Sequence, residues 1–241
     1  MGSHTVFIAD LHLDPGQPLQ CQLALNFLQQ ARHAKALYIL GDLFEYWIGD
    51  DAGIPLYNEV VDALAVASAH CQITIMLGNR DFLLGEEFAS AANATLIRED
   101  ELVIELDGKP VLLLHGDTLC TEDREYQAFR QQVRDPQWQQ TFLDKTIDER
   151  IAYANYLREQ SKQLSAEKTT QLMDVCASQV QSRFDASACK TMIHGHTHRP
   201  HIHTDKVTER CRVVLGDWHP DHALYALHDS TGLHLRRFES I

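Results

Sequence analysis

Five short apolar runs recur along this chain, and each is followed at once by polar residues. The runs are Thr5–Ala9, Ala36–Leu40, Ile73–Leu77, Val111–Leu114 and Thr191–Ile193. Near-continuous hydrophobicity without alternation is typical of strands that are buried on both faces. The segments between the runs are long enough for helices, which favours crossover connections. The pattern therefore predicts an α/β fold.

The polar clusters that follow the runs contain side chains that bind hard metal ions. They read Asp10-Leu-His12, Gly41-Asp42, Gly78-Asn79-Arg80-Asp81, His115-Gly-Asp117 and Gly195-His196-Thr-His198. Taken singly, such a cluster is most often a cap or a turn. Five in succession favour one shared site, because ligands bind beyond the carboxyl ends of the strands in an open α/β sheet.

Local spacing adds two expectations about the backbone of these clusters. Asp10 and His12 are two residues apart, so an extended backbone would direct both side chains to the same side and to one ion. The glycines are expected to provide tight turns and a close backbone approach. These are Gly41, Gly78, Gly116 and Gly195.

The candidate ligands are about half carboxylate or amide oxygens and half imidazole nitrogens, without cysteine. They are Asp10, His12, Asp42, Asn79, His115, His196 and His198. This donor set suits Mn²⁺, Fe²⁺ or Zn²⁺ better than Mg²⁺ or Ca²⁺, and Mn²⁺ is the first choice. One tetrahedral ion cannot use so many ligands, whereas two ions roughly 3.5 to 4 Å apart can share a bridging carboxylate. We expect two divalent ions with Asp42 as the bridge.

The order of these clusters resembles the signature of the calcineurin-like metallophosphoesterases. That signature runs Asp-x-His, Gly-Asp, Gly-Asn-His-Asp/Glu, His and Gly-His-x-His. The resemblance implies a sandwich of β-sheets flanked by helices, with water activated by two metals as the nucleophile. It also implies two ligand sets. The first is Asp10, His12, Asp42 and His198, and the second is Asp42, Asn79, His115 and His196.

One position departs from this signature, because Arg80 stands where most of the family has histidine. That histidine normally assists the leaving group. Arginine cannot act as a general acid near neutral pH, but it can neutralise charge that develops on phosphate oxygens. The leaving group should therefore need no proton, which favours a phosphoanhydride over a simple ester.

A closer resemblance, to the pyrophosphatases of lipid A biosynthesis that act on UDP-2,3-diacylglucosamine, rests on longer motifs. They include Ile8-Ala-Asp-Leu-His-Leu13, Leu40-Gly-Asp-Leu-Phe-Glu45, Gly78-Asn-Arg-Asp-Phe-Leu-Leu-Gly85 and His115-Gly-Asp-Thr-Leu-Cys-Thr121. The resemblance implies attack on the UMP phosphorus, which releases UMP and 2,3-diacylglucosamine 1-phosphate (lipid X). It also implies substrate contacts by Asn79, Arg80, Asp123, Ser161, Ser165, Lys168 and His196. Ser161, Ser165 and Lys168 stand in a polar stretch that is equally typical of a solvated helix face.

The segment from about residue 121 to 185 contains no glycine and no strand-like run. Its apolar residues recur at helical spacing, so we interpret it as a helical cap inserted into a single domain that spans residues 1–241. Most of these apolar residues are expected to pack the cap on the core, and a minority to face lipid.

The composition of the chain limits the classes of partner that it can bind. The net charge of −13 opposes binding to nucleic acid. No apolar segment is long enough to span a membrane, and no leader sequence is evident, so we expect a cytoplasmic protein with peripheral contact to the inner membrane. No obligate protein partner is evident. The six cysteines lack Cys-x-x-Cys spacing and are predicted to be free thiols.

Two other functions remain open. One is another metallophosphoesterase activity, such as that of a cyclic-nucleotide phosphodiesterase or a phosphoprotein phosphatase, which Arg80 and the helical segment disfavour. The other is an inactive scaffold that uses the fold only to bind proteins. Retention of all the candidate ligands makes the scaffold the weakest of the three.

Overall fold

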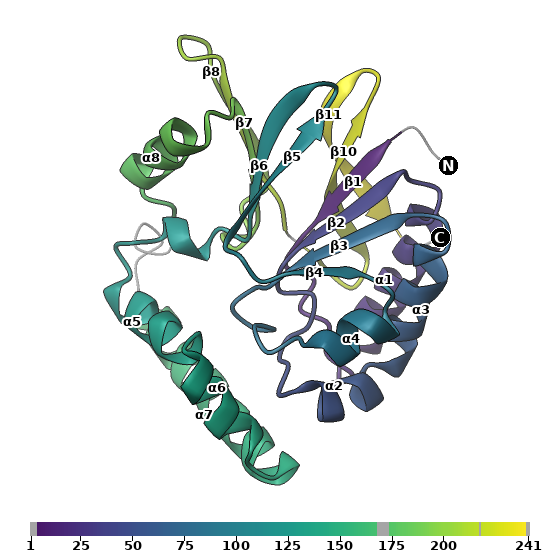
Figure 1. Ribbon diagram of the computed structural model, residues 1–241, viewed down its shortest axis with the longest axis vertical. Coiled ribbons are helices and arrows are strands. Elements are labelled where there is room, and N and C mark those ends of the chain that lie inside the picture. Colours follow the sequence, from purple (N-terminus) through teal and green to yellow (C-terminus); the bar gives the residue numbers. More distant parts are fainter. Residues whose placement is uncertain (1–3, 168–173, 217, 240–241) are drawn as a thin grey trace.

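The computed structural model describes residues 4–167, 174–216 and 218–239, without the side chains of residues 160–167. Two β-sheets face each other, and helices cover their outer faces (Figure 1). The six-stranded sheet has the order β11-β10-β1-β2-β3-β4, in which β1 to β4 are parallel. Its strands are β1 (Thr5–Ile8), β2 (Ala36–Leu40), β3 (Gln72–Met76), β4 (Thr95–Ile97), β10 (His222–Asp229) and β11 (Gly232–Glu239).

The five-stranded sheet has the order β5-β6-β7-β9-β8. The three inner strands are parallel, and each edge strand is antiparallel to its neighbour. The strands are β5 (Glu101–Leu106), β6 (Lys109–Leu114), β7 (Thr191–His194), β8 (His201–Asp205) and β9 (Arg210–Val214). All five predicted apolar runs are strands, and the α/β sandwich is confirmed. Three of the runs lie in the six-stranded sheet and two, β6 and β7, in the five-stranded sheet.

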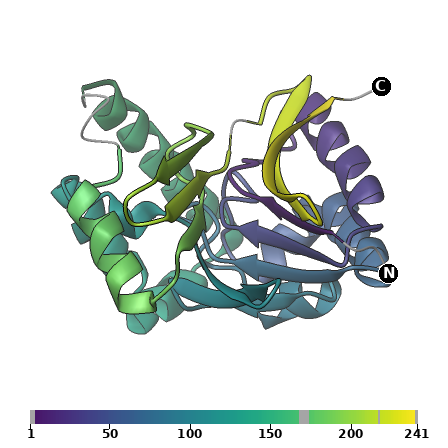
Figure 2. The same ribbon diagram turned by 90° about the horizontal axis from the view of Figure 1, so that it is seen from above.

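The helices lie outside this sandwich, and Figure 2 shows them on both sides of the paired sheets. Next to the six-stranded sheet are α1 (Pro18–Ala31), α2 (Asp50–Leu56), α3 (Asn58–Ser68) and α4 (Glu86–Ala91). The others are α5 (Arg124–Val133), α6 (Pro136–Leu143), α7 (Ile147–Glu167) and α8 (Ala177–Ser187). None of the helices in the described part of the chain has the length and hydrophobicity that a membrane crossing requires.

Alternation along the strands explains why their sequences are apolar throughout. In β1, Val6 and Ile8 pack against the helices, whereas Phe7 packs between the sheets. In β6, Leu113 faces the space between the sheets, and Leu112 packs with Phe184 of α8. Each strand therefore separates two apolar layers, and the sandwich has the layer order helices, sheet, sheet, helix.

The segment predicted as a cap contains α5 to α8. Arg150 of α7 is buried and fixes this helix to the start of α2, because its Nη1 donates to the carbonyl of Ile48 in the preceding loop (2.6 Å) and to Oδ1 of Asp51 in the first turn (2.8 Å). The six cysteines, all in the described part of the chain, form no disulfide bonds, as predicted. The division into one domain with an inserted cap remains a prediction.

Candidate active site

The candidate ligands converge where the carboxyl ends of β1, β2 and β3 meet those of β6 and β7. In a first group, Asp10, His12 and His198 place one ligand atom each within 4.8 Å of the other two. His12 Nε2 lies 3.1 Å from His198 Nε2, and His198 Nε2 lies 3.8 Å from Asp10 Oδ1. The two sheets therefore contribute jointly to one cluster.

A second group adjoins the first. Asp10, Asp42 and His115 also place ligand atoms within 4.8 Å of one another, and all three side chains are buried. Asn79 Oδ1 lies 2.9 Å from His115 Nε2 and 3.0 Å from His196 Nδ1. All seven candidate ligands are thus brought together.

Asp42 belongs to the second group and also lies close to a histidine of the first. Its Oδ2 is 3.7 Å from His12 Nε2 and 3.8 Å from His115 Nε2, while its Oδ1 accepts the backbone N–H of Arg80 at 2.8 Å. Burial would raise the pKa of Asp42, but the neighbouring His115, His12 and Arg80 lower it. The carboxylate is therefore ionised, and it lies within 4 Å of one histidine from each group.

The backbone of these ligands differs from the expectation for the first cluster. Asp10 and His12 have φ values of 56° and 47°, so they adopt the left-handed conformation and not the extended one. Asp42, His196 and His198 also have positive φ, at 52°, 69° and 52°. Non-glycine residues adopt this conformation at a cost of about 1 kcal/mol or more each, and such strain clusters at functional sites. The backbone therefore turns sharply at the ligands that follow β1, β2 and β7.

The prediction of close backbone approach at glycine is confirmed at two positions. A Cβ atom at Gly78 would overlap the carboxylate of Asp42, and one at Gly195 would overlap that of Asp10. Only glycine leaves room for these buried carboxylates against the neighbouring loops.

The protonation states suit a cation site. Burial lowers the pKa of His196 and that of His198 to about 4, so both rings are neutral near pH 7. Nδ1 of His115 lies 2.8 Å from the Leu40 carbonyl, which can only accept a hydrogen bond. Burial would lower the pKa of His115, but Asp42, Asp117 and Asp10 raise it to about 8, so a cation that binds there would displace a proton from Nε2.

The chemistry of this donor set fits divalent metal. Oδ1 of Asp10 is buried and accepts no hydrogen bond from any described residue, while Oδ2 of the same residue accepts the His196 backbone N–H at 2.8 Å. A buried carboxylate oxygen without a donor is costly unless a cation is close. Burial and the charge of Asp42 raise the pKa of Asp10 to about 7 despite the nearby His115, as expected for a carboxylate without its counterion.

Asp81, in the third cluster, has a structural task. Its carboxylate accepts backbone N–H groups of Leu43 (2.8 Å), Gly78 (2.9 Å) and Asp42 (3.2 Å), and the side chain is fully buried. It joins the loop after β2 to the loop after β3 and holds Asp42 in its left-handed conformation.

Replacement of Asp81 by alanine should destabilise the fold. The Asp81→Ala change leaves buried N–H groups of two loops without an acceptor, so we expect a loss of about 3 kcal/mol or more in the free energy of unfolding. Urea denaturation would measure it, with Asp62→Ala on the exposed face of α3 as the control. Equal stability of the two variants would contradict this role.

Asp117, in the fourth cluster, contacts α5. Its Oδ2 accepts the Tyr126 hydroxyl (2.6 Å) and Arg130 Nε (2.7 Å). Burial would raise the pKa of Asp117, but His115, His196 and Arg130 lower it, and the carboxylate remains charged. The ring of Tyr126 lies 5.8 Å from that of His196, so this anchor brings α5 to the edge of the ligand cluster.

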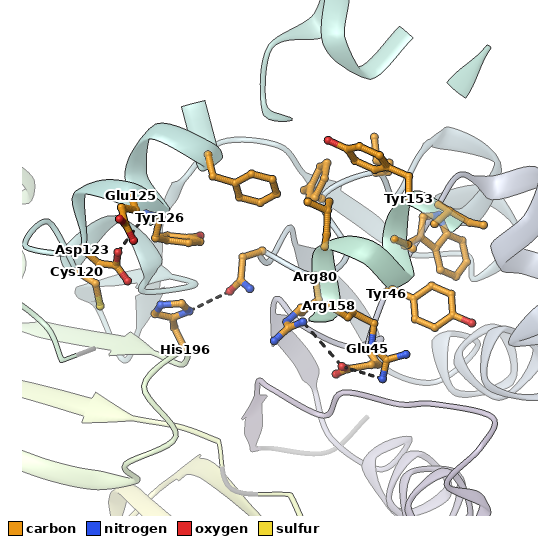
Figure 3. Close-up of a pocket in the computed structure, with 18 of the residues that line it drawn as sticks. Glu45, Tyr46, Arg80, Cys120, Asp123, Glu125, Tyr126, Tyr153, Arg158 and His196 are labelled. Carbon is orange, nitrogen blue, oxygen red and sulfur yellow. Dashed lines mark hydrogen bonds and ion pairs between the residues drawn. The ribbon is translucent and has the colours of Figure 1, made fainter. Parts of the chain in front are cut away.

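A cavity of about 580 Å³ opens directly on the ligand cluster (Figure 3). One end is polar, with Asn79, Arg80, His196 and His198. The opposite wall is apolar and mostly aromatic, formed by Ile48, Phe82, Phe129, Trp138, Phe142, Tyr153 and Leu157. The helical segment therefore supplies an apolar chamber beside the candidate metal centre.

The residues expected to contact substrate divide into two groups. Asn79, Arg80, Asp123 and His196 line the cavity. Asp123 is also the N-cap of α5, because its Oδ1 accepts the Tyr126 N–H at 3.1 Å. Lys168 and the side chains of Ser161 and Ser165 lie outside the described residues.

Sequence reasoning missed Glu45 and Arg158. Glu45 Oε2 is 3.2 Å from His12 Nδ1, and Arg158 of α7 lies 3.4 Å from the same carboxylate. Burial would raise the pKa of Glu45, but His12, Arg80 and Arg158 lower it. The position of Glu45, three residues after Asp42, was an available signal. No local pattern distinguishes Arg158 from other helical arginines.

Residues 3–200 match the family model described as calcineurin-like phosphoesterase. In fold, the chain is similar to an archaeal phosphodiesterase, with a TM-score of 0.52 and 12% identity over 98% of this chain and 99% of the other. The chain belongs to the calcineurin-like phosphoesterase family and is a metal-dependent hydrolase.

Much more similar relatives share one name, UDP-2,3-diacylglucosamine hydrolase. The relative from Cellvibrio japonicus is 48% identical, covering 98% of this chain and 99% of its own length. Those from Chromohalobacter salexigens (46%) and Yersinia enterocolitica (47%) cover 90% and 89% of this chain, and 89% and 91% of their own lengths. The closer resemblance is thereby confirmed, since the chain is a member of the sequence family that carries this name.

Proposed function

We propose that this protein hydrolyses the pyrophosphate bond of UDP-2,3-diacylglucosamine in lipid A biosynthesis. Water attacks the UMP phosphorus, and the products are UMP and 2,3-diacylglucosamine 1-phosphate. The observation that carries the proposal is the cavity, because one continuous space joins a cluster of metal-ligand side chains to an aromatic and aliphatic chamber. A lipid-linked nucleotide needs both kinds of surface.

We propose that two divalent ions, most suitably Mn²⁺, bind at this cluster. Asp10, His12, Asp42 and His198 would hold one, and Asp42, Asn79, His115 and His196 the other. The ions would supply an activated water and neutralise phosphate charge. The mixture of imidazole nitrogen with carboxylate and amide oxygen supports Mn²⁺ over Mg²⁺ or Ca²⁺.

Residues next to the candidate ligands would bind the phosphate groups and the acyl chains. Arg80 lies at the polar end of the cavity, where its guanidinium can pair with phosphate oxygens in the transition state. The leaving group is the lipid phosphate, which can depart as an anion and needs no proton donor. An arginine, which cannot donate a proton near neutral pH, is therefore compatible with this reaction. Trp138, Phe142 and Tyr153 form a contiguous aromatic wall, with ring centroids 5.2 to 6.2 Å apart, that suits acyl chains.

A lipid substrate also implies work at a membrane surface. We propose peripheral contact with the inner membrane, with the helical segment nearest to the lipid. Exposed apolar side chains at the α6–α7 corner, Leu143, Ile147 and Ile151, support this placement.

The assay that tests the function uses UDP-2,3-diacylglucosamine beside bis(p-nitrophenyl) phosphate, with Mn²⁺ added or chelated. We expect Mn²⁺-dependent release of UMP from the lipid substrate, and none after chelation. In ¹⁸O-labelled water the label should enter UMP and not the lipid phosphate, because water attacks the UMP phosphorus.

Two outcomes would contradict parts of the proposal. Turnover of the generic diester alone would retain the metal centre and favour another metallophosphoesterase activity. Label in the lipid phosphate would retain the substrate and reverse the direction of attack.

A further inference from the structure

The loops after β1 and β2 run side by side beyond the sheet. Short parallel pairing continues there, because the His12 N–H donates to the Asp42 carbonyl (3.0 Å) and the Leu13 N–H to the Leu43 carbonyl (3.0 Å). The Glu45 N–H returns a bond to the Leu13 carbonyl at 2.9 Å. This register fixes the Glu45 backbone beside His12.

The side chain of Glu45 contacts three functional elements at once. Its Oε2 lies 3.2 Å from Nδ1 of His12, and its Oε1 lies 3.8 Å from Nη1 of Arg80 and 3.4 Å from Nη2 of Arg158. Figure 3 shows both guanidinium groups directed to this carboxylate. A ligand of the candidate centre, the phosphate-facing arginine and the helix α7 therefore meet at one residue.

The two imidazole nitrogens of His12 face different groups. Nε2 faces Asp42 Oδ2 and His198 Nε2, so it is the atom that would bind metal. Nδ1 faces Glu45, which can only accept a hydrogen bond when ionised. Carboxylates in this position orient metal-binding histidines and raise their basicity.

Arg158 connects the same carboxylate to the wall of the cavity. Its guanidinium lies over the Tyr46 ring at 5.6 Å and within 3.5 Å of Asp14 Oδ2. Both Arg158 and Tyr46 line the cavity. The position of α7 is thus tied to the loop that orients His12.

We infer that Glu45 is a positioning residue that orients His12 toward the metal and holds Arg80 and Arg158 at the junction of the polar and apolar parts of the cavity. The inference rests on the proposed function of the site. If this is so, the Glu45 carboxylate couples metal binding, through His12, to the position of α7, through Arg158.

Calorimetric titration of metal-free protein with Mn²⁺ tests the first part. Glu45→Gln should bind Mn²⁺ about 10- to 100-fold more weakly than the unaltered chain, because the amide removes the negative charge that lies 3.2 Å from His12 Nδ1. The matched control is Glu86→Gln at the start of α4, whose side chain is exposed and pairs with Arg98. Unchanged Mn²⁺ affinity in Glu45→Gln would overturn the inference. Absence of Mn²⁺ binding in the unaltered chain would instead refute the metal centre itself.

A double-mutant cycle tests the second part. Glu45→Gln and Arg158→Gln should each raise KM for the lipid substrate, and the double variant should raise it by less than the product of the two effects. Multiplicative effects would show that Glu45 does not act through Arg158. If Glu45→Gln fails to fold, Glu45→Asp retains the charge but shortens the reach, and the same loss of Mn²⁺ affinity is expected.

Discussion

Asp42→Ala should reduce Mn²⁺-dependent release of UMP to the background without enzyme. Asp42 Oδ2 is almost equidistant from His12 Nε2 and His115 Nε2, at 3.7 and 3.8 Å, so it faces one histidine of each group of candidate ligands. Without it, two neighbouring cations would repel each other with no bridging charge between them. Assay of turnover together with the metal content of the purified variant measures the effect.

Asp62→Ala provides the control for that experiment, since it removes the same side chain from the exposed face of α3. It should retain both turnover and metal. An Asp42→Ala protein that is loaded with metal and active would rule out the bridge.

Arg80→Ala should lower the rate by about 10²- to 10³-fold and leave the metal content intact. The contact of residue 80 with Asp42 is made by its backbone N–H, which alanine retains. Its side chain reaches into the cavity, where it can pair with phosphate oxygens. The loss should therefore appear in the rate of the chemical step, measured under single-turnover conditions with Mn²⁺ in excess.

Arg98→Ala is the matched control, because Arg98 is half exposed and pairs only weakly with the exposed Glu86. Loss of bound metal in Arg80→Ala would mean that this arginine supports the metal centre and not the phosphate. A rate equal to that of the control would exclude Arg80 from the reaction.

The strands that carry the site were predictable because both of their faces are buried. The run Ala36–Leu40 coincides with β2, and the other four runs agree with their strands within two residues. Strands such as β8, in which four of five residues are exposed, have no comparable pattern. The number of sheets was not predictable from the runs either, because a strand buried between two layers has the same sequence in either sheet.

The identity of the candidate ligands followed from residue type and spacing, but their geometry did not. The left-handed conformation of Asp10 and His12 depends on bonds to another loop, such as that from the Asp10 N–H to the Gly41 carbonyl at 3.1 Å. The meeting of Glu45 with Arg158 depends on how α7 lies against the core. Such contacts are set by tertiary packing and have no signature in local sequence.

The division of the ligands between the two sheets has a mechanical consequence. Asp10 and Asp42 follow strands of one sheet, and His115 and His196 follow strands of the other. Bound metal would therefore link the two sheets. Any sliding of one sheet past the other would alter the distances between ligand atoms. Side chains packed between the two sheets, such as Phe7 and Leu113, would then influence the affinity for metal without contacting it.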